Sequence, residues 1–204
     1  INRYKKDTFE LPADKAEKLQ KLKQSIYNIK NCNLKKNATN IVFADGNPKA
    51  KIMLIGEGPG SNEDLEGLPF VGRAGALLDK MLASINLDRK QVYITNLVNY
   101  RPPENRTPTA EEVERYLPYL KKHIEIIDPK ILVLLGSSAM NAIINQKEVI
   151  SKVRGKWIEK IIGKCKTSII VTFHPAFLMR QPVQKKMAWV DLKMIREKKV
   201  KLKI

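Results

Sequence analysis

Four short apolar runs, each bounded by polar or turn residues, most strongly limit how this chain can fold. They are KIMLI (51–55), VYIT (92–95), ILVLL (131–135) and SIIVT (168–172). Short runs that are apolar at nearly every position are typical of strands buried on both faces of a parallel sheet. Helical patterns lie around and between them, at about 14–29, 73–86, 109–127, 137–145 and 184–198. This alternation predicts βαβ units, and hence an α/β sandwich around a short, mainly parallel four-stranded sheet.

The segment NATNIVFADGNP (37–48) precedes the first of these runs. It predicts an entry strand or an extended segment that ends in a turn at 46–48, because Gly and Pro favour turns. No linker is long enough to divide the chain, and 204 residues suit one hydrophobic core. We therefore expect a single domain over residues 1–204.

The charge balance favours a polyanionic partner. The chain carries 38 Lys and Arg against 21 Asp and Glu, which gives a formal net charge of +17. Such a surface neutralises phosphates and releases their counterions on binding. A general bias toward Lys, Asn and Ile explains the same excess without a partner, so charge alone leaves nucleic-acid binding open.

Length and composition disfavour several other classes of protein. Two cysteines, Cys32 and Cys165, are too few for a disulfide framework or a self-contained zinc site. No apolar run approaches the roughly 18–20 residues of a membrane span, and the first 15 residues contain no signal-peptide apolar region. We expect a cytoplasmic protein that has no membrane partner.

The segments that follow the four runs carry the unusual residues. They are GEGPG (56–60), NLVNYRPPENRTP (96–108), GSSA (136–139) and FHPAFLMR (173–180). In a parallel α/β sheet all four segments emerge at the carboxyl edge of the strands, where such folds build their sites. We therefore expect these residues to converge.

Taken one at a time, these features are open to ordinary structural explanations. GEGPG fits neither G-x-G-x-x-G nor the phosphate-binding loop that ends in Lys-Ser/Thr, which disfavours a nucleotide cofactor. Asn96 at a strand end is equally well explained as a satisfied turn residue, and Glu66 as part of a solvated loop. Of the two histidines, His174 follows a strand, whereas His123 lies on a Lys-rich helix and is either a surface or a packing residue.

Taken together, four linked motifs resemble the family 4 uracil-DNA glycosylases in order and spacing. The motifs are GEGPGSNED (56–64), GLPFVGRAG (67–75) with LLDKML (77–82), TNLVNYRPPENRTP (95–108) and FHPAFLMR (173–180). The resemblance covers about residues 25–197. It implies a three-layer α/β/α fold and a DNA repair enzyme that excises uracil from DNA, leaves an abasic site and needs no cofactor for the chemistry.

Three side chains take roles in base recognition under this resemblance. Excision requires the nucleotide to leave the base stack and enter a pocket, and Phe70 is the face on which the extruded uracil would stack. Asn96 would read the base, because an amide can accept from uracil N3–H and donate to O4, whereas cytosine presents the opposite pattern. His174 would donate to uracil O2, where negative charge grows as the glycosidic bond breaks.

The acidic residues of the same loop are expected to act on the sugar and the loop itself. An ionised carboxylate near the sugar can orient water and favour the cationic sugar, and Glu63 is our choice for this role. Glu57 would brace the loop, by pairing with Asn105 or Arg106 of the PENR segment. Asp64 would shape the turn.

Two glycines mark a departure from better-known relatives. Gly58 and Gly60 would let the backbone approach the base and lend N–H groups to the pocket. The family 1 enzymes carry an Asp and a Tyr in the corresponding loop, so how the thymine methyl is excluded is not implied by the resemblance.

Duplex DNA would be held by basic residues and opened by a wedge. Arg101 and Arg106 are expected to bind DNA, and HPAFLMR should supply the group that enters the duplex as the base leaves. Leu178, Met179 and Arg180 are the candidates for that wedge. The expected partner is uracil-containing DNA, bound by a monomer.

The chain also departs from the family at an iron–sulfur site. Family 4 enzymes commonly hold a [4Fe-4S] cluster on four cysteines, and the corresponding positions here read Ile29, Cys32, Tyr100 and Tyr116. Cys165 matches none of the three missing ligands. A cubane cluster needs about four thiolates, for which Ile and Tyr do not substitute. We expect no cluster, a free thiol at Cys32, and packing of the other three side chains in that volume.

Two other function classes stay open at this point. The first is a non-catalytic nucleic-acid-binding α/β module that retains the motifs as relics, against which stand the intact Glu63, Asn96 and His174. The second is a nucleotide-binding enzyme that uses GEGPG for phosphate, against which stands the missing Lys-Ser/Thr.

Overall fold

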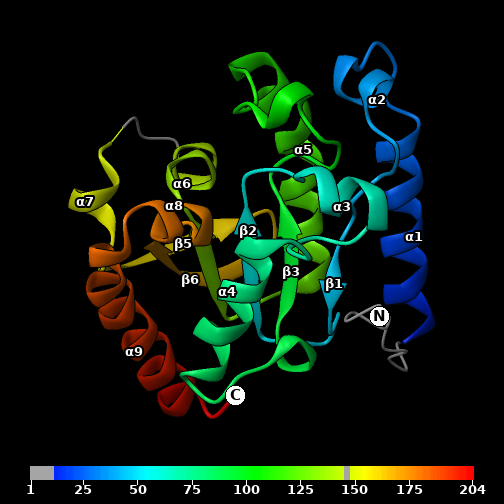
Figure 1. Ribbon diagram of the computed structural model, residues 1–204. Coiled ribbons are helices and arrows are strands. Elements are labelled where there is room, and N and C mark those ends of the chain that lie inside the picture. The colour runs from blue at the N-terminus through cyan, green and yellow to red at the C-terminus, as the bar shows by residue number, and fades with distance from the viewer. Residues whose placement is uncertain (1–11, 145–147) are drawn as a thin grey trace.

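A computed structural model of the chain describes residues 12–144 and 148–204. Within them, one sheet has the strand order β1-β3-β2-β4-β6-β5 (Figure 1). The strands are β1 (Asp45–Gly46), β2 (Ile52–Gly56), β3 (Tyr93–Asn96), β4 (Ile131–Leu135), β5 (Trp157–Ile162) and β6 (Cys165–Thr172). The prediction of one domain over 1–204 and the absence of a signal peptide involve residues 1–11, which lie outside the described residues, and they stay predictions.

The four apolar runs form the four central strands, as predicted. Strands β3, β2, β4 and β6 pair in parallel, whereas β1 and β5 pair antiparallel at the two edges. The prediction of a mainly parallel four-stranded sheet is therefore wrong, since the described sheet has six strands and is mixed. The two added strands are edge strands. Strand β1, of 2 residues, lies within 37–48, where an entry strand or an extended segment was predicted. Strand β5 was missed, because it leaves several side chains accessible and has no continuous apolar run.

The predicted helices are present, with shifted ends. The helices are α1 (Ala13–Tyr27), α2 (Asn33–Asn37), α3 (Ser61–Glu66), α4 (Arg73–Ala83), α5 (Ala110–Ile127), α6 (Ser137–Ile144), α7 (Ile150–Val153), α8 (Pro175–Arg180) and α9 (Lys185–Leu202), with short 3-10 turns η1 (Arg89–Gln91), η2 (Pro103–Asn105) and η3 (Pro182–Gln184). Helix α4 ends before the predicted residue 86, and the chain then turns at Asn86, which has a φ of 58°. No helix within the described ranges is long and apolar enough to span a membrane.

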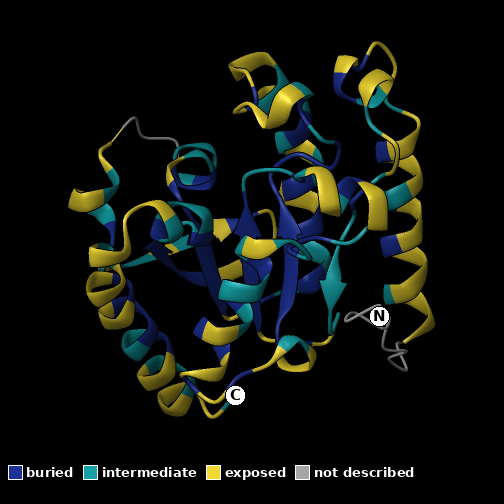
Figure 2. Cartoon of the chain, in the orientation of Figure 1, coloured by how far each residue is buried: buried dark blue, intermediate teal, exposed yellow. Residues whose placement is uncertain are grey.

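Helices cover both faces of the sheet, and each face carries its own apolar core. Side chains alternate along a strand, so Met53 and Ile55 of β2 face the core formed with α1, α5 and α6. Ile52 and Leu54 of the same strand face the core formed with α4, α8 and α9. Figure 2 shows the central strands almost entirely buried, with exposed residues on the outer sides of the helices. Burial on both faces explains why these runs are apolar at nearly every position.

A buried ion pair fastens the last helix to the sheet. Arg154 donates through Nε to Asp191 Oδ2 at 3.0 Å and through Nη2 to Asp191 Oδ1 at 2.5 Å, while Thr172 Oγ1 donates to Asp191 Oδ2 at 2.7 Å. Asp191 lies on α9, and Thr172 ends β6. The Arg154 ion pair therefore holds Asp191 in place, and the Thr172 hydrogen bond joins Asp191 to the strand end from which the chain continues to His174.

His123 is a packing residue, one of the two alternatives left open by the sequence. It lies on α5, is 2% exposed, stacks on Phe43 with ring centroids 4.6 Å apart, and its Nε2 lies 2.8 Å from the Tyr93 hydroxyl. Burial lowers the pKa of His123 to about 3. The imidazole is therefore neutral in the folded protein at neutral pH.

We expect His123 to make the protein sensitive to acid. Its pKa is depressed by folding, so its contribution to stability is fully present above about pH 6.5 and is lost as the pH falls toward 3. Between about pH 7 and about pH 4.5 the free energy of unfolding should drop by about 2–3 kcal/mol from this residue alone. Urea unfolding at both values should show a smaller drop for His123→Phe than for the parent. An equal drop in both proteins would contradict a buried neutral His123.

Candidate active site

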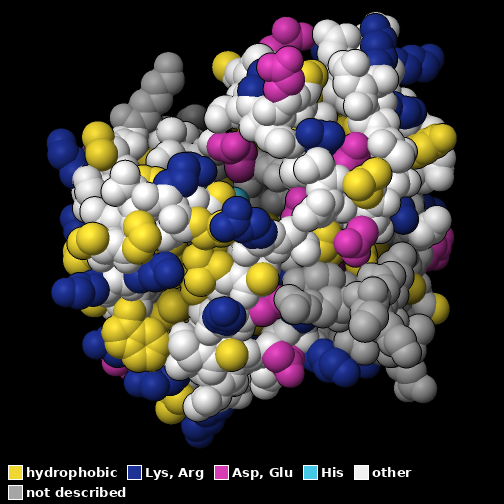
Figure 3. All heavy atoms as spheres, viewed as in Figure 1, with side chains coloured by type: hydrophobic (Ala, Val, Ile, Leu, Met, Phe, Trp, Pro, Cys, Tyr) yellow, Lys and Arg dark blue, Asp and Glu magenta, His cyan; other side chains and the backbone are white. Residues whose placement is uncertain are grey.

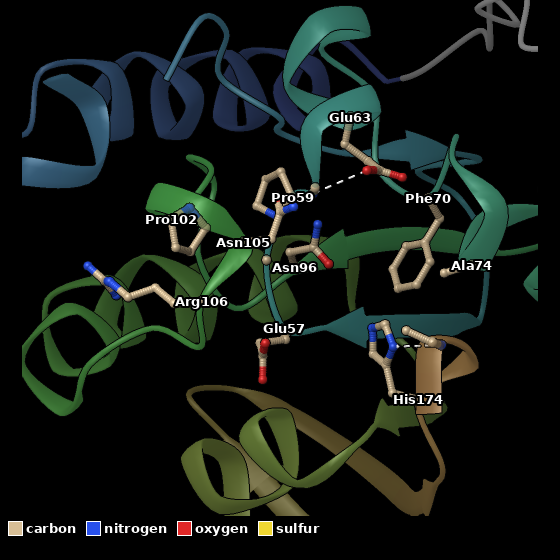
Figure 4. Close-up of a pocket in the computed structure, with 13 residues that line it drawn as sticks. Glu57, Pro59, Glu63, Phe70, Ala74, Asn96, Pro102, Asn105, Arg106 and His174 are labelled. Atoms are coloured by element: carbon tan, nitrogen blue, oxygen red, sulfur yellow. Dashed lines mark hydrogen bonds between the residues drawn. The ribbon is translucent and has the colours of Figure 1, made fainter. Parts of the chain in front are cut away.

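A pocket of about 170 Å³ opens at the carboxyl ends of the central strands (Figure 4). Its lining includes the following residues that the sequence indicated: Glu57, Gly58, Gly60, Glu63, Phe70, Asn96, Asn105, Arg106 and His174. They come from the loops that follow β2, β3 and β6, together with the end of β3. The predicted convergence of these loops at one edge of the sheet is confirmed.

The Phe70 ring forms one wall of the pocket, and the backbone of Phe70 has an unusual conformation. Phe70 has a φ of 55°, a left-handed conformation that costs a bulky residue roughly 1–2 kcal/mol. Its carbonyl oxygen accepts from Arg89 Nη2, and a Cβ added at Gly75 would lie 1.7 Å from the same oxygen. The first turn of α4 therefore packs directly against the Phe70 peptide, which requires glycine at position 75.

Gly56, the last residue of β2, makes room for two pocket side chains. A Cβ at this position would lie 2.4 Å from Asn96 Oδ1 and 2.5 Å from Phe70 Cζ. The sequence pointed instead to Gly58 and Gly60, where an added Cβ would first meet the end of a side chain, of Val98 and Glu63 respectively. The sequence could have indicated this role for Gly56, because Gly56 is the first glycine of GEGPG and directly follows an apolar run.

Asn96 ends β3 and points its amide into the pocket beside Phe70 (Figure 4). The residue is 3% exposed, and its Oδ1 has no hydrogen-bond partner among the described residues. Leaving a buried polar atom unpaired costs about 1–3 kcal/mol, and such atoms are rare in folded proteins. The unpaired oxygen is thus poised to accept from a bound molecule.

His174 caps α8 and presents one defined nitrogen to the pocket. Its Nδ1 accepts from the Ala176 N–H at 3.1 Å, so in the neutral ring the proton lies on Nε2. Burial lowers the pKa of His174 to about 4, and the positive charge of Arg180 acts in the same direction. The ring lies 5.5 Å from Phe70, centroid to centroid, at an interplanar angle of 31°. His174 is therefore a neutral hydrogen-bond donor at neutral pH.

The Glu63 carboxylate is occupied by the backbone. Oε2 accepts from the Gly60 N–H at 3.1 Å, while Oε1 accepts from the N–H groups of Val71 and Gly72 at 2.9 and 2.8 Å. These bonds tie the start of α3 to the start of α4. The geometry makes Glu63 a brace of the loop, and it favours another residue for the water-orienting role predicted for Glu63.

Glu57 follows β2 and contacts a residue that the sequence reasoning did not assign. One of its carboxylate oxygens accepts a short hydrogen bond from Ser138 Oγ, in the first turn of α6. Ser138 lies in GSSA, which was noted as the segment after the third apolar run but was given no role. Glu57 also lines the hollow beside the pocket, together with His174 and Arg180.

The predicted pairing of Glu57 with Asn105 or Arg106 is wrong. Arg106 instead binds both carboxylate oxygens of Glu112, each at 2.8 Å, while Asn105 Oδ1 accepts from Arg101 Nε at 2.8 Å. Glu112 lies in the first turn of α5, where a carboxylate is favoured by the helix dipole and where it also accepts from the Thr109 N–H at 2.8 Å. This local capping contact explains why the Arg106 guanidinium binds Glu112 and not Glu57.

The remaining acidic residues of the loop behave as predicted. Asp64 is 3% exposed, and its Oδ1 accepts from the N–H groups of Thr39 and Asn40 at 2.9 and 3.1 Å. It therefore shapes the turn by joining it to the segment ahead of β1. Glu66 is exposed, as expected of a residue in a solvated loop.

Leu178 does not lie at the surface, so the prediction that it contacts DNA is wrong. It is 1% exposed and belongs to the core shared with α4 and α9. Pro175 and Leu178, three residues apart on α8, face the core together, whereas Arg180 at the end of α8 is exposed. Val183, three residues further on, is 77% exposed and was missed because it lies outside HPAFLMR.

The residues at the iron–sulfur positions pack against one another. Cys32 Sγ lies 3.2 Å from the Tyr116 hydroxyl, and both residues are buried in the core that also holds Tyr100 and Ile29. Burial raises the pKa of Tyr100 to about 12 and raises that of Tyr116 further still, so both phenols stay neutral. One thiol, two neutral phenols and an aliphatic chain do not fit the ligand set of a cubane cluster.

No other metal-binding group appears in the described part of the chain. Groups of three or more His, Cys, Asp or Glu with suitable placement are lacking there. Cys165 is buried elsewhere, and its Sγ contacts the Pro129 carbonyl oxygen at 3.6 Å. Cys165 therefore cannot provide a further thiolate ligand beside Cys32.

Lysine and arginine side chains are spread over the face of the molecule that holds the pocket. Figure 3 shows them on one face beside a hollow in which a histidine is visible, with several acidic side chains near the rim. A basic surface beside a pocket of this kind suits a polyanion that presents one group to the pocket.

Comparison with known proteins identifies relatives over most of the chain. The sequence profile described as "Uracil DNA glycosylase superfamily" matches residues 43–193. The chain is 43% identical over 189 residues to a type-4 uracil-DNA glycosylase of Sulfurisphaera tokodaii, covering 89% of this chain and 84% of that protein. It is 43% identical over 185 residues to a type-4 uracil-DNA glycosylase of Archaeoglobus fulgidus, covering 89% and 93%. Another relative, from Thermotoga maritima, carries the same name and is 47% identical over 150 residues, covering 73% and 77%.

Proposed function

We propose that this chain, which belongs to the uracil-DNA glycosylase superfamily and within it to the type-4 enzymes, hydrolyses the N-glycosidic bond of uracil in DNA. The products are free uracil and an abasic site, as in base excision repair. The observation that carries this proposal is the unpaired Asn96 Oδ1 in the same pocket as the Phe70 ring and the neutral His174 donor. The base must leave the duplex to reach so deep a position.

Asn96 reads the base. Its Oδ1 would accept from uracil N3–H, which supplies the partner that this buried oxygen lacks, while the amide nitrogen donates to O4. Cytosine has an acceptor at N3 and a donor at the exocyclic amine, so both contacts become unfavourable. Unpaired buried groups of this kind give discrimination of a few kcal/mol.

His174 stabilises the departing base. As the glycosidic bond breaks, negative charge collects on uracil O2, and a fixed donor aimed at such an oxygen contributes about 3 kcal/mol to the transition state. The Ala176 N–H holds Nδ1, so Nε2–H is the available donor. A pKa of about 4 keeps the ring neutral at working pH, so the donor is the same throughout the neutral range.

Glu57 is better suited than Glu63 to orient the attacking water. The oxygens of Glu63 accept three backbone N–H groups, whereas Glu57 accepts the Ser138 hydroxyl and lines both the pocket and the adjoining hollow. An ionised carboxylate there can accept a proton from water and favour the cationic sugar. Ser138 holds the carboxylate while it does so.

The basic surface holds the DNA. The net charge of +17 supports phosphate binding, and Arg180 is exposed beside the pocket opening. Met179 and Arg180 remain candidates for the wedge, and the exposed Val183 extends the same surface. A monomeric state and a cytoplasmic location remain predictions.

The first prediction tests the function itself. The protein should convert an oligonucleotide with a single uracil into an alkali-labile product on a gel, and Asn96→Ala should lose at least about 100-fold in rate, the cost of roughly 3 kcal/mol of contacts. Asn96→Asp should weaken uracil excision and relax discrimination against cytosine. The Ala variant should keep the parent's melting temperature within a few degrees.

Two outcomes would contradict this reading. Binding of the oligonucleotide by the parent without any alkali-labile product would favour the non-catalytic nucleic-acid-binding module. A folded Asn96→Ala protein that excises uracil at the parent rate would remove Asn96 from base recognition.

The second prediction separates the two acids. Glu57→Gln should lower the single-turnover rate about 100-fold, in the range typical of lost general base catalysis, with little change in stability. Glu63→Gln should lower the free energy of unfolding by about 1–3 kcal/mol, because one oxygen becomes an amide nitrogen that faces a backbone N–H. Urea unfolding and single-turnover kinetics on both variants decide between the two roles. The water-orienting role would be assigned to Glu63 if Glu63→Gln kept the parent's stability but lost most of its excision rate, and if Glu57→Gln excised uracil at the parent rate.

The third prediction concerns the cluster. We propose that the chain holds no [4Fe-4S] cluster, which the packing of Cys32 against Tyr116 supports. Protein purified anaerobically should be colourless, contain no stoichiometric iron or sulfide, and excise uracil unchanged after treatment with an iron chelator. Iron near four atoms per chain would contradict the proposal and require other ligands.

A further inference from the structure

Arg89 lies outside the pocket, in η1 ahead of β3, yet it grips the segment that carries Phe70. Its Nη1 donates to the Pro69 carbonyl oxygen at 3.1 Å, and its Nη2 donates to the Phe70 carbonyl oxygen. The same guanidinium binds Asp45 Oδ2 through Nη1 and Asp79 Oδ1 through Nε, each at 2.7 Å. Since Asp45 lies on β1 and Asp79 on α4, the guanidinium is fixed from two sides.

The two carbonyl contacts act on a peptide that needs external support. Phe70 has a φ of 55°, a conformation that an aromatic residue keeps only where its surroundings impose it. Gly75 allows α4 to approach the Phe70 oxygen from one side, and Arg89 supplies its hydrogen-bond donor from the other. Without Arg89, that carbonyl would lose its charged donor, and the same peptide would be held only by the Val71 N–H bond to Glu63 and by its contact with α4, which weakens its hold on the left-handed region.

The orientation of this peptide decides where the Phe70 ring lies. Phe70 Cζ approaches Gly56 so closely that an added Cβ would lie 2.5 Å away, and the ring is 5.5 Å from the His174 ring. If the φ of Phe70 returned to a negative value, the ring would move away from its position between Gly56 and His174. The ring would then no longer face the position where the base stacks.

We propose that Arg89 is a positioning residue for uracil excision, which acts by holding the Phe70 ring in its stacking position. This inference rests on the proposed function. Arg89 does not line the pocket in which the base would bind. Its effect on the reaction passes entirely through Phe70, so it should vanish when the aromatic face is absent.

Arg115 offers a matched control. Its Nη1 donates to the carbonyl oxygens of Lys30 and Asn31 at 3.0 and 3.2 Å, its Nη2 contacts Glu111 at 3.3 Å, and Asn31 has a φ of 52°. This is the same kind of clamp on a left-handed residue, but it lies at the junction of the α1–α2 segment with α5. Loss of Arg115 should therefore cost stability without touching the base.

The test is a double-mutant cycle of Arg89→Met and Phe70→Leu, measured by single-turnover excision at saturating enzyme and by DNA affinity. Arg89→Met should lower the rate about tenfold, within the range given by loss of one base–aromatic stack, and leave DNA affinity within about twofold. In the Phe70→Leu background the further loss should be below about twofold, because coupled residues are not additive. Arg115→Met should lower the melting temperature yet excise uracil at the parent rate in both backgrounds.

Arg89→Lys covers the case in which Arg89→Met does not fold. A single ammonium keeps the charge between Asp45 and Asp79 but cannot reach both acids and both carbonyl oxygens together. Its rate should fall, and the fall should again disappear in the Phe70→Leu background. Equal rate losses in both backgrounds, or a parent rate in Arg89→Lys, would overturn the inference. Absence of excision by the parent protein would instead defeat the proposed function.

Discussion

The parallel register of β2 and β3 sets Gly56 opposite Asn96, and the pocket depends on that pairing. Because Gly56 has no Cβ, the amide of Asn96 can lie directly beside the Gly56 backbone. The space left by the missing Cβ receives the edge of the Phe70 ring. His174, delivered by the parallel strand β6, then closes the pocket from a third loop. A slip of one residue between these strands would turn Asn96 to the other face of the sheet.

The central strands and most of the pocket could be predicted from the sequence, because they follow from continuous apolar runs and from where parallel strands end. Strand β5 (Trp157–Ile162) could not, because it has accessible positions and therefore no uniform hydrophobic pattern. Strand β1 was expected only as an entry strand or extended segment within 37–48, because two residues are too few to fix its bounds. Leu178 was misplaced for a related reason, since a motif gives the order of residues but not the face of α8 that packs on the core.

The supporting contacts of the pocket were the least predictable part. Whether Glu63 or Glu57 has a free carboxylate oxygen depends on which backbone N–H groups point at it, and those directions arise only when α3 and α4 are placed together. Arg89 is distant in the sequence from Phe70, and only the folded chain brings it to that carbonyl. The need for glycine at position 75 is likewise visible only in the folded chain, where α4 approaches the Phe70 peptide closely. Residues of this kind carry no local pattern that distinguishes them.

The contact between Cys32 and Tyr116 has a consequence for how this protein matures. Where a metal cluster joins segments distant in the sequence, folding of that region waits for delivery of the metal, and binding energy becomes folding energy. Here the junction between α2 and α5 is made by side chains that the chain itself supplies. On the proposal that the chain holds no cluster, this region would reach its native packing as soon as the chain is synthesised, independently of iron supply and of oxidants that destroy exposed iron–sulfur centres.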